Sequence, residues 1–438
     1  MIRTAICSAI LLATAAFAQQ PDPQLAAYID SIQAIDNHAH VIAPDVADDK
    51  GYDALRCEEL PPTVGPDPAN VRFGPLTQLT WKALYGVEPA NEDQADKQHD
   101  QMLATLRKQH GEDYFDWLLQ KAGVDRVLAN RVTMSPGLHP PHFLWVPYDD
   151  ALLFPLNNDE LKQANPDRRA LFNMEEQVRQ RYLDDAGLKS IPATLDEFIA
   201  KVVRPTLEKQ KQAGAVAIKF EAAYLRALDF AAATHDAAAA VYAKSVGGPT
   251  PSAADYKVLQ DFLFHEVAVQ AGKLGLAVHI HTGLGCGQFF NDPGSDPMLL
   301  TQAFDDPSLR GTNFVMLHGG TPFERHATSL IVKPNVYVDT SVLELIYSPA
   351  ELARIMRPWL ELMPERILYG SDSGNFGPGM EWQETNWLAT HQFRRALATV
   401  LTDMVRDGAI TMPRAKEIAT RVLRDNALEL YKLNHPTR

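Results

Sequence analysis

The segment AIDNHAH, residues 34–40, ends a short apolar run with two histidines, His38 and His40. Residues two apart in a β-strand point to the same side, so both imidazoles are predicted to face one interior. Paired imidazoles suit a borderline cation such as zinc. The spacing alone leaves a metal site and a chance pair equally open.

Outward from this segment, short apolar runs alternate with helical stretches, a pattern typical of a parallel sheet built from βα units. The predicted strands are residues 34–37, 126–131, 143–148, 215–220, 276–281, 313–318, 336–339 and 366–369. The predicted helices include residues 195–212, 254–273, 349–362, 386–407 and 413–433. We therefore expect an α/β protein with one (β/α)8 TIM barrel. It carries a long helical insertion at residues 42–124 after the first strand, with a proline-rich loop at 61–68, and it ends in C-terminal helices.

The first residues predict export. Arg3 gives a basic start, residues 5–17 are mostly apolar, and Ala16-Phe17-Ala18 forms an A-x-A cleavage pattern. We expect a signal peptide at 1–18, one barrel domain at 19–438, and a periplasmic or secreted protein. The apolar run is shorter than the roughly 20 residues of a membrane span, so the mature protein is expected to have none. An uncleaved N-terminal anchor and a division into two ordinary domains are the alternatives.

The composition limits the classes of partner. The formal net charge of −14 argues against nucleic acid and anionic membranes as partners. The expected partner is a small-molecule substrate, which the charge does not identify. The charge also leaves open whether the chain forms a homo-oligomer. Three cysteines are too few to build a disulfide scaffold, although an oxidising compartment would permit a bridge between Cys57 and Cys286.

Three later strands also end in polar residues. VHIHTG (278–283) contains His281, MLHGG (316–320) contains His318, and YGSDS (369–373) contains Asp372. Barrel enzymes keep their active sites at the C-terminal ends of the strands, so these side chains are expected to meet His38 and His40.

This ordered set resembles the amidohydrolase superfamily, and in particular its amidohydrolase-related branch. The likeness extends over residues 35–372. Besides the histidines and Asp372, it is carried by Lys219, Tyr224 with Arg226, His281-Thr282-Gly283, Leu317-His318 through Pro322, and Asn335-Val336-Tyr337. The chain departs from the pattern at Cys286, where relatives often have an acidic residue.

The resemblance implies a divalent metal cofactor, with zinc the expected ion, held by His38, His40, His281 and Asp372. Metal binding requires neutral imidazoles and an ionised carboxylate. One ion is expected, or two if Lys219 is carbamylated and bridges them.

The resemblance also implies the catalytic roles. Asp372 would take a proton from metal-activated water. His318 would be either a further ligand or the residue that polarises the substrate and moves protons. Lys219 and Arg226 are the candidate substrate-binding residues, with ion pairs as their alternatives, Glu221 being the partner expected for Lys219.

The expected reaction is hydrolysis of an amide, lactone or ester-like bond by metal-activated water. The alternatives are a metal-dependent non-oxidative decarboxylase, and a non-catalytic metal- or solute-binding protein of the periplasm. His279 lies one pleat below His281, and we expect it to be a hydrogen-bonded interior residue.

Overall fold

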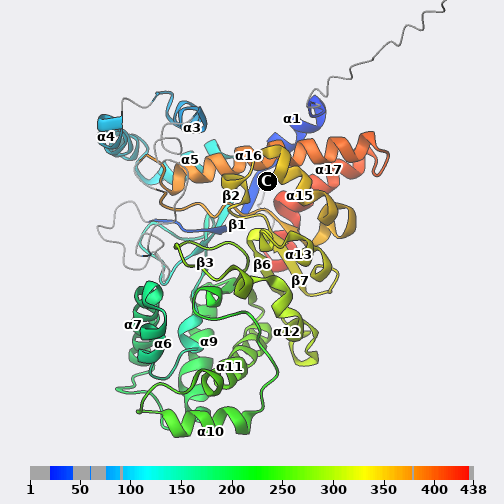
Figure 1. The fold of residues 1–438 in the computed structure, drawn as a ribbon. Helices are drawn as coiled ribbons and strands as arrows, with labels where there is room; N and C mark the ends of the chain where they lie inside the picture. The colour runs from blue at the N-terminus through cyan, green and yellow to red at the C-terminus, as the bar shows by residue number, and fades with distance from the viewer. Residues whose placement is uncertain (1–19, 43–59, 61–74, 89–91, 377–378, 434–438) are drawn as a thin grey trace, which may run out of the picture.

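The computed structural model describes residues 20–42, 60, 75–88, 92–376 and 379–433 (Figure 1). The predicted signal peptide, Cys57 and the proline-rich segment at 61–68 lie outside these residues. Among the described helices, none is both long and apolar enough to cross a membrane.

All eight predicted strands are present, and each overlaps its predicted range. They are β1 (Ala34–Ala39), β2 (Val124–Asn130), β3 (Phe143–Val146), β4 (Ala217–Phe220), β5 (Ala277–His281), β6 (Phe314–Leu317), β7 (Val336–Asp339) and β8 (Ile367–Leu368). Every paired neighbour is parallel, in a sheet β1-β2-β3 and a sheet β4-β5-β6-β7-β8.

Isolated parallel bridges join the two sheets at both edges. Trp145 bridges to Ala215 and Tyr148 to Lys219, while Ala39 bridges to Ser373 just beyond β8. The eight strands therefore follow one another in chain order around the expected (β/α)8 barrel. These two seams carry sparser backbone pairing than the ladders within each sheet.

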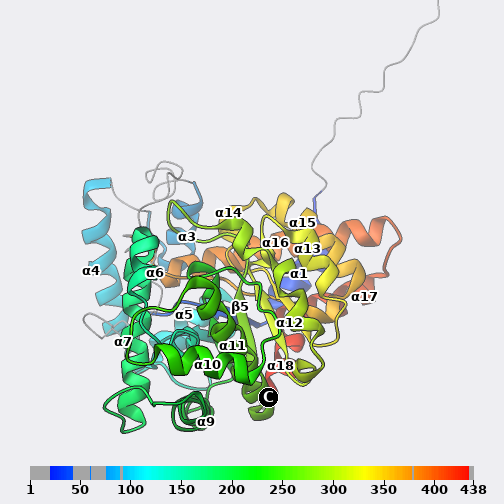
Figure 2. The same cartoon turned by 60° about the horizontal axis from the view of Figure 1, so that its bottom comes forward.

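Helices surround the strands (Figures 1 and 2). They are α1 (Pro23–Ser31), α3 (Pro75–Tyr85), α4 (Glu92–His110), α5 (Tyr114–Ala122), α6 (Asp159–Ala164), α7 (Arg169–Asp185), α8 (Leu195–Phe198), α9 (Arg204–Gln212), α10 (His235–Ser245), α11 (Ala253–Leu274), α12 (Thr301–Asp305), α13 (Glu324–Leu330), α14 (Leu343–Ile346), α15 (Pro349–Leu362), α16 (Trp382–Arg406), α17 (Met412–Thr420) and α18 (Asn426–Tyr431). The described part of the insertion after β1 is helical, as expected, in α3, α4 and α5.

Two predicted helices contain π-helical turns. Ile199–Val203 lies between α8 and α9, and Arg421–Asp425 lies between α17 and α18. Helix α16 begins at Trp382, before the predicted residue 386, because Glu381 and Glu384 form a capping box at its N-terminus. Gly123 and Gly275 end α5 and α11 in the left-handed conformation, which turns the chain directly into β2 and β5.

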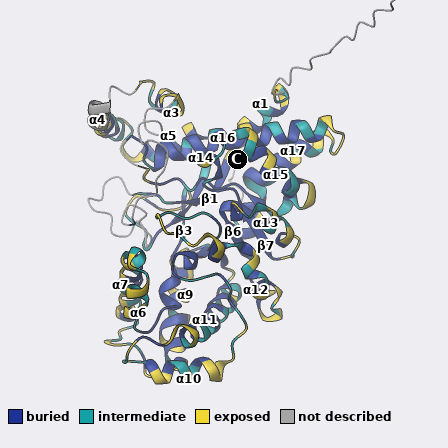
Figure 3. Cartoon of the chain, in the orientation of Figure 1, coloured by how far each residue is buried: buried dark blue, intermediate teal, exposed yellow. Residues whose placement is uncertain are grey.

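The buried residues, dark blue in Figure 3, include two hydrophobic clusters. The larger lies between the strands and the surrounding helices. The smaller includes Ile35, Leu128, Val315 and Leu368 from the strands, together with Leu428 and Tyr431 of α18. The C-terminal helix therefore contributes to the barrel interior, and the polar ends of the strands remain for the site.

Candidate metal centre

The two histidines of β1 reach one carboxylate. The pairing of β1 with β2 shifts register between Asp36 and Ala39. His38 lies within this irregularity and His40 just after it. His38 Nε2 lies 2.9 Å, and His40 Nε2 3.2 Å, from Asp372 Oδ1. Residues more than 300 positions apart in the chain thus meet at the mouth of the barrel, as is expected of its strand ends.

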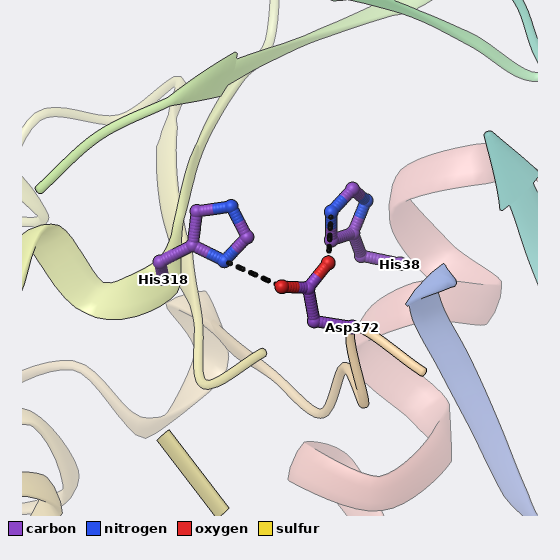
Figure 4. Close-up of side chains that lie close together, drawn as sticks. All are labelled: His38, His318 and Asp372. Atoms are coloured by element: carbon purple, nitrogen blue, oxygen red, sulfur yellow. Dashed lines mark ion pairs between the residues drawn. The ribbon is translucent and has the colours of Figure 1, made fainter. Parts of the chain in front are cut away.

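His318 and Asp372 both sit in tight turns just past a strand. Their φ angles are 64° and 53°, a left-handed region that non-glycine residues rarely adopt. Backbone hydrogen bonds hold the turns: His318 N donates to Asp339 Oδ1 at 2.9 Å, and Asp372 N donates to His38 O at 2.8 Å. The turns bring His318 Nδ1 within 3.9 Å of Asp372 Oδ2 (Figure 4). Backbone strain of this kind is often found at functional sites.

The separations of these donor atoms fit a bound cation. One ligand atom each from His38, His318 and Asp372 lies within 4.8 Å of the other two. Tetrahedral zinc with bonds of about 2.0–2.2 Å holds its ligand atoms roughly 3.4 Å apart. The distances from Asp372 to His38 (2.9 Å) and to His318 (3.9 Å) bracket that spacing.

Unsatisfied atoms at His38 support the same fit. His38 Nε2 is buried without a well-aligned hydrogen bond, and Asn130 Oδ1 is also buried without a partner. Asn130 Nδ2 lies 2.5 Å from His38 Nδ1. Exchanging the amide oxygen and nitrogen of Asn130 would let Oδ1 accept from the Nδ1–H, leaving the Nε2 lone pair to a cation.

The charge states suit metal binding. Burial lowers the pKa of His318 to about 3 and holds the pKa of His38 well below its ordinary value, so both imidazoles are neutral. Burial alone would raise the pKa of Asp372, but interactions with His318 and His38 outweigh it and hold that pKa well below its ordinary value. Neutral imidazoles beside an ionised carboxylate are the forms that coordinate metal.

Residues that the sequence analysis did not single out orient the three imidazoles. Asn130, at the end of β2, contacts His38 as described above. Tyr148 Oη lies 3.2 Å from His40 Nδ1, and Ser341 Oγ lies 3.0 Å from His318 Nδ1. Ser341 Oγ also lies 2.7 Å from Asp339 Oδ1, which links the His318 ring to the end of β7. The same rule that singled out His318, a polar residue at the end of a barrel strand, could have identified Asn130 and Asp339.

His281 lies beside the cluster rather than within it. Its Nδ1 is 3.0 Å from His318 Nε2 and 3.3 Å from Glu221 Oε2, and its Nε2 is 2.8 Å from Leu284 O. The structure therefore brings His38, His40, His318 and Asp372 together around Asp372, with His281 on the far side of His318.

The two candidate substrate-binding residues form internal ion pairs. Lys219 Nζ lies 2.9 Å from Glu221 Oε1, with both side chains buried. Burial alone would raise the pKa of Glu221, but Lys219 and His281 outweigh it and lower that pKa. Arg226 Nη2 lies 2.7 Å from Asp261 Oδ1. The role of each in binding substrate stays a prediction.

His279 is a hydrogen-bonded interior residue, as expected. It is fully buried, and its Nε2 lies 2.7 Å from Tyr431 Oη of α18. Burial, followed by the charge of Lys219, lowers the pKa of His279 to about 3. Cys286, the one cysteine among the described residues, is disulfide-bonded.

Comparison with known proteins agrees with this geometry. A family model described as "Amidohydrolase" matches residues 35–433. Protein fluG of Emericella nidulans is 34% identical over 191 residues, which make up 42% of this chain and 21% of that protein. The chain thus spans about a fifth of the length of this relative.

Solved structures show the same fold at low identity. A glucuronate isomerase from Caulobacter crescentus matches with a TM-score of 0.64 and 14% identity, covering 94% of each chain. A Lactobacillus casei protein described as a metal-dependent hydrolase matches with a TM-score of 0.59 and 16% identity, covering 93% of this chain and 97% of its own. Because the family model covers most of the sequence, the chain belongs to the amidohydrolase family.

Proposed function

We propose that this amidohydrolase hydrolyses an amide, lactone or ester bond of a small molecule with the help of a divalent cation, zinc being the expected ion. One observation carries the proposal: His38, His40 and His318 converge on the two oxygens of the partly buried Asp372 carboxylate. His38, His40 and Asp372 would hold the ion, and His318 is near enough to join them.

When bound, such a cation lowers the pKa of water to about 7 and polarises a substrate carbonyl. The residues of the chain supply the proton transfers. Asp372 Oδ1 faces His38 and His40, which leaves Oδ2 as the oxygen that accepts the proton of the attacking water. His318 Nδ1 lies 3.9 Å from this Oδ2, and Ser341 fixes the ring. His318 is therefore placed to receive a proton or to polarise the substrate.

The ion pairs favour hydrolysis over decarboxylation. Lys219 and Arg226 would favour decarboxylation if they bound a substrate carboxylate beside the metal. Lys219 pairs with Glu221, and Arg226 pairs with Asp261, so both charges are already balanced within the protein.

The test is turnover by the zinc-loaded protein on lactones, aryl esters and N-acyl amino acids, with aromatic acids assayed in parallel for CO2 release. Asp372→Asn is expected to lower hydrolysis about 10²–10⁴-fold, the usual contribution of a general base. Asp292→Asn, at an exposed aspartate, is the control and should retain activity. CO2 release without hydrolysis would favour the decarboxylase, and ligand binding without turnover would favour a solute-binding protein.

We also propose that the chain is exported, with cleavage after Ala18. Its basic, apolar and A-x-A segments support this, and a disulfide-bonded Cys286 fits an oxidising compartment. N-terminal sequencing of the protein secreted by its host would test the cleavage site.

A further inference from the structure

Asp36 is a fully buried carboxylate of β1, two residues before His38. Its Oδ1 accepts from two backbone amides, that of His38 at 3.2 Å and that of Ser371 at 2.8 Å. Its Oδ2 accepts from Ser371 Oγ at 2.5 Å and from Asn386 Nδ2 at 2.7 Å. A carboxylate has about four lone-pair sites, so these donors fill them and fix the orientation of the side chain.

These hydrogen bonds join the two segments that carry metal ligands. His38 lies in the irregular part of β1, and Ser371 immediately precedes Asp372. The φ of 53° at Asp372 is a conformation that a non-glycine residue keeps only when its surroundings hold it there. Because Asp36 binds the backbone of both segments, it holds His38 and the turn of Asp372 at a fixed separation.

Buried neighbours reinforce this link. Ser371 Oγ, which donates to Asp36, also accepts from Ser373 N at 3.0 Å. The residues on either side of Asp372 are therefore both tied to Asp36. Asn386 belongs to α16, so the helix that follows the turn supports the carboxylate as well. Ser371, Ser373 and Asn386 are all buried, which shields these hydrogen bonds from competition with water.

We propose that Asp36 is a positioning residue of the metal centre, which sets the separation between His38 and Asp372 at which one cation binds to both. The inference deepens the proposed function and rests on it. Asp36 acts on the backbone that carries these ligands and leaves their side chains to the cation. A site whose ligands are already held in place loses less conformational entropy when the ion binds, so its affinity is higher. Without this acceptor, the turn at Asp372 relaxes towards an ordinary negative φ, which moves its carboxylate away from His38.

The first measurement compares the zinc affinities of Asp36→Ala and Asp36→Asn by competition with a chromophoric chelator. Asp36→Ala removes every acceptor and should weaken zinc binding roughly 10–100-fold, the usual contribution of groups that orient metal ligands. Asp36→Asn keeps one oxygen for the two backbone amides. Its amide nitrogen can donate to Ser371 Oγ, and Asn386 can turn its amide oxygen towards it. Asp36→Asn should therefore bind zinc nearly as tightly as the parent.

Asn426→Ala is the matched control, because Asn426 is also buried and ties down the other end of β8. Its Nδ2 donates to Pro364 O and Ile367 O, both at 2.8 Å. Its loss should lower the free energy of unfolding, measured with urea, and leave the zinc affinity unchanged. Cobalt(II) in place of zinc gives a visible spectrum that reports the arrangement of the ligands. Among these three variants, that spectrum should change in Asp36→Ala alone, because a general loss of stability does not move the ligands.

The proposal is overturned by parent-like zinc affinity in Asp36→Ala, by equal losses in Asp36→Ala and Asn426→Ala, or by an Asp36→Asn variant as weak as Asp36→Ala. A parent that binds no zinc overturns it together with the proposed metal site. If Asp36→Ala does not fold, Ser371→Ala takes its place. This variant removes one hydrogen bond to Asp36 and should weaken zinc binding about fivefold, and an unchanged affinity would contradict the proposal. Binding needs no turnover, so a protein that meets these expectations and hydrolyses nothing would overturn the proposed function and leave the role of Asp36 standing.

Discussion

The two sides of the barrel mouth balance their charges differently. On the side formed by β1, β6 and β8, the neutral imidazoles of His38 and His318, together with His40, surround one ionised carboxylate, and no lysine or arginine among the described residues forms an ion pair with it. On the side formed by β4 and β5, the buried Lys219 already neutralises Glu221 at 2.9 Å. The first arrangement attracts a cation, whereas in the second the positive and negative charges already balance.

This difference bears on the number of ions. A second ion bridged by a carbamylated Lys219 would require that lysine to leave Glu221, a buried carboxylate that would then need another partner. The ion pair therefore favours one ion, held on the Asp372 side.

The largest expected effect is a loss of stability when the ion pair between Lys219 and Glu221 is broken. Glu221→Gln leaves the Lys219 ammonium buried and unpaired, and should lower the free energy of unfolding by about 3–5 kcal/mol. Urea denaturation of the metal-free protein measures this. The double variant Lys219→Met/Glu221→Gln should recover much of the loss, because no buried charge remains. Equal losses in the single and double variants would show that the pairing is not what stabilises this side.

The next effect is on metal affinity. Asn130→Ala removes the side chain that orients His38. Contacts of this kind typically contribute roughly 10–100-fold to metal affinity, so the variant should bind zinc more weakly by about that factor. Competition with a chromophoric chelator measures the affinity. Asp292→Asn, at an exposed aspartate, is the control and is expected to leave the affinity unchanged. Similar losses in both variants would contradict the assignment of the ion to the Asp372 side.

A third effect, on the pH dependence of stability, concerns an acid at the seam between β3 and β4 that has no cationic partner among the described residues. Burial raises the pKa of Asp149 to about 7, even though Gln210 and Tyr182 donate hydrogen bonds to it. An unfolded chain ionises this group near pH 4, so the folded state loses relative stability as pH rises from about 4 to about 7.

Asp149→Asn removes that loss. The free energy of unfolding of the Asp149→Asn variant, relative to that of the unmodified protein, should therefore increase from about pH 4 to about pH 7 and stay constant at higher pH. Urea denaturation across this range tests the prediction, with Asp184→Asn, at an exposed aspartate on α7, as the control. A constant difference between variant and parent across the range would show that Asp149 ionises normally in the folded protein.

The strands could be predicted because each is a short apolar run ending in polar residues, as at 34–40 and 276–281. Helix α15 was predicted to the residue because Ser348 caps it and Pro349 begins it. The π-helical turns were not predicted, since no local signal distinguishes Ile199–Val203 from ordinary helix.

The residues of the site could be predicted from the sequence, but the contacts that their side chains make could be predicted less well. His38, His318 and Asp372 follow from their positions at strand ends. The direction of the His281 ring does not, because it depends on Glu221 and His318, which come from neighbouring strands.

The central claim is that one cation binds on the Asp372 side while Lys219 stays paired with Glu221. The most direct measurement is the zinc content per chain of the zinc-loaded, full-length protein after removal of free metal. The account predicts one zinc ion per chain. Two tightly held ions, or none, would contradict it.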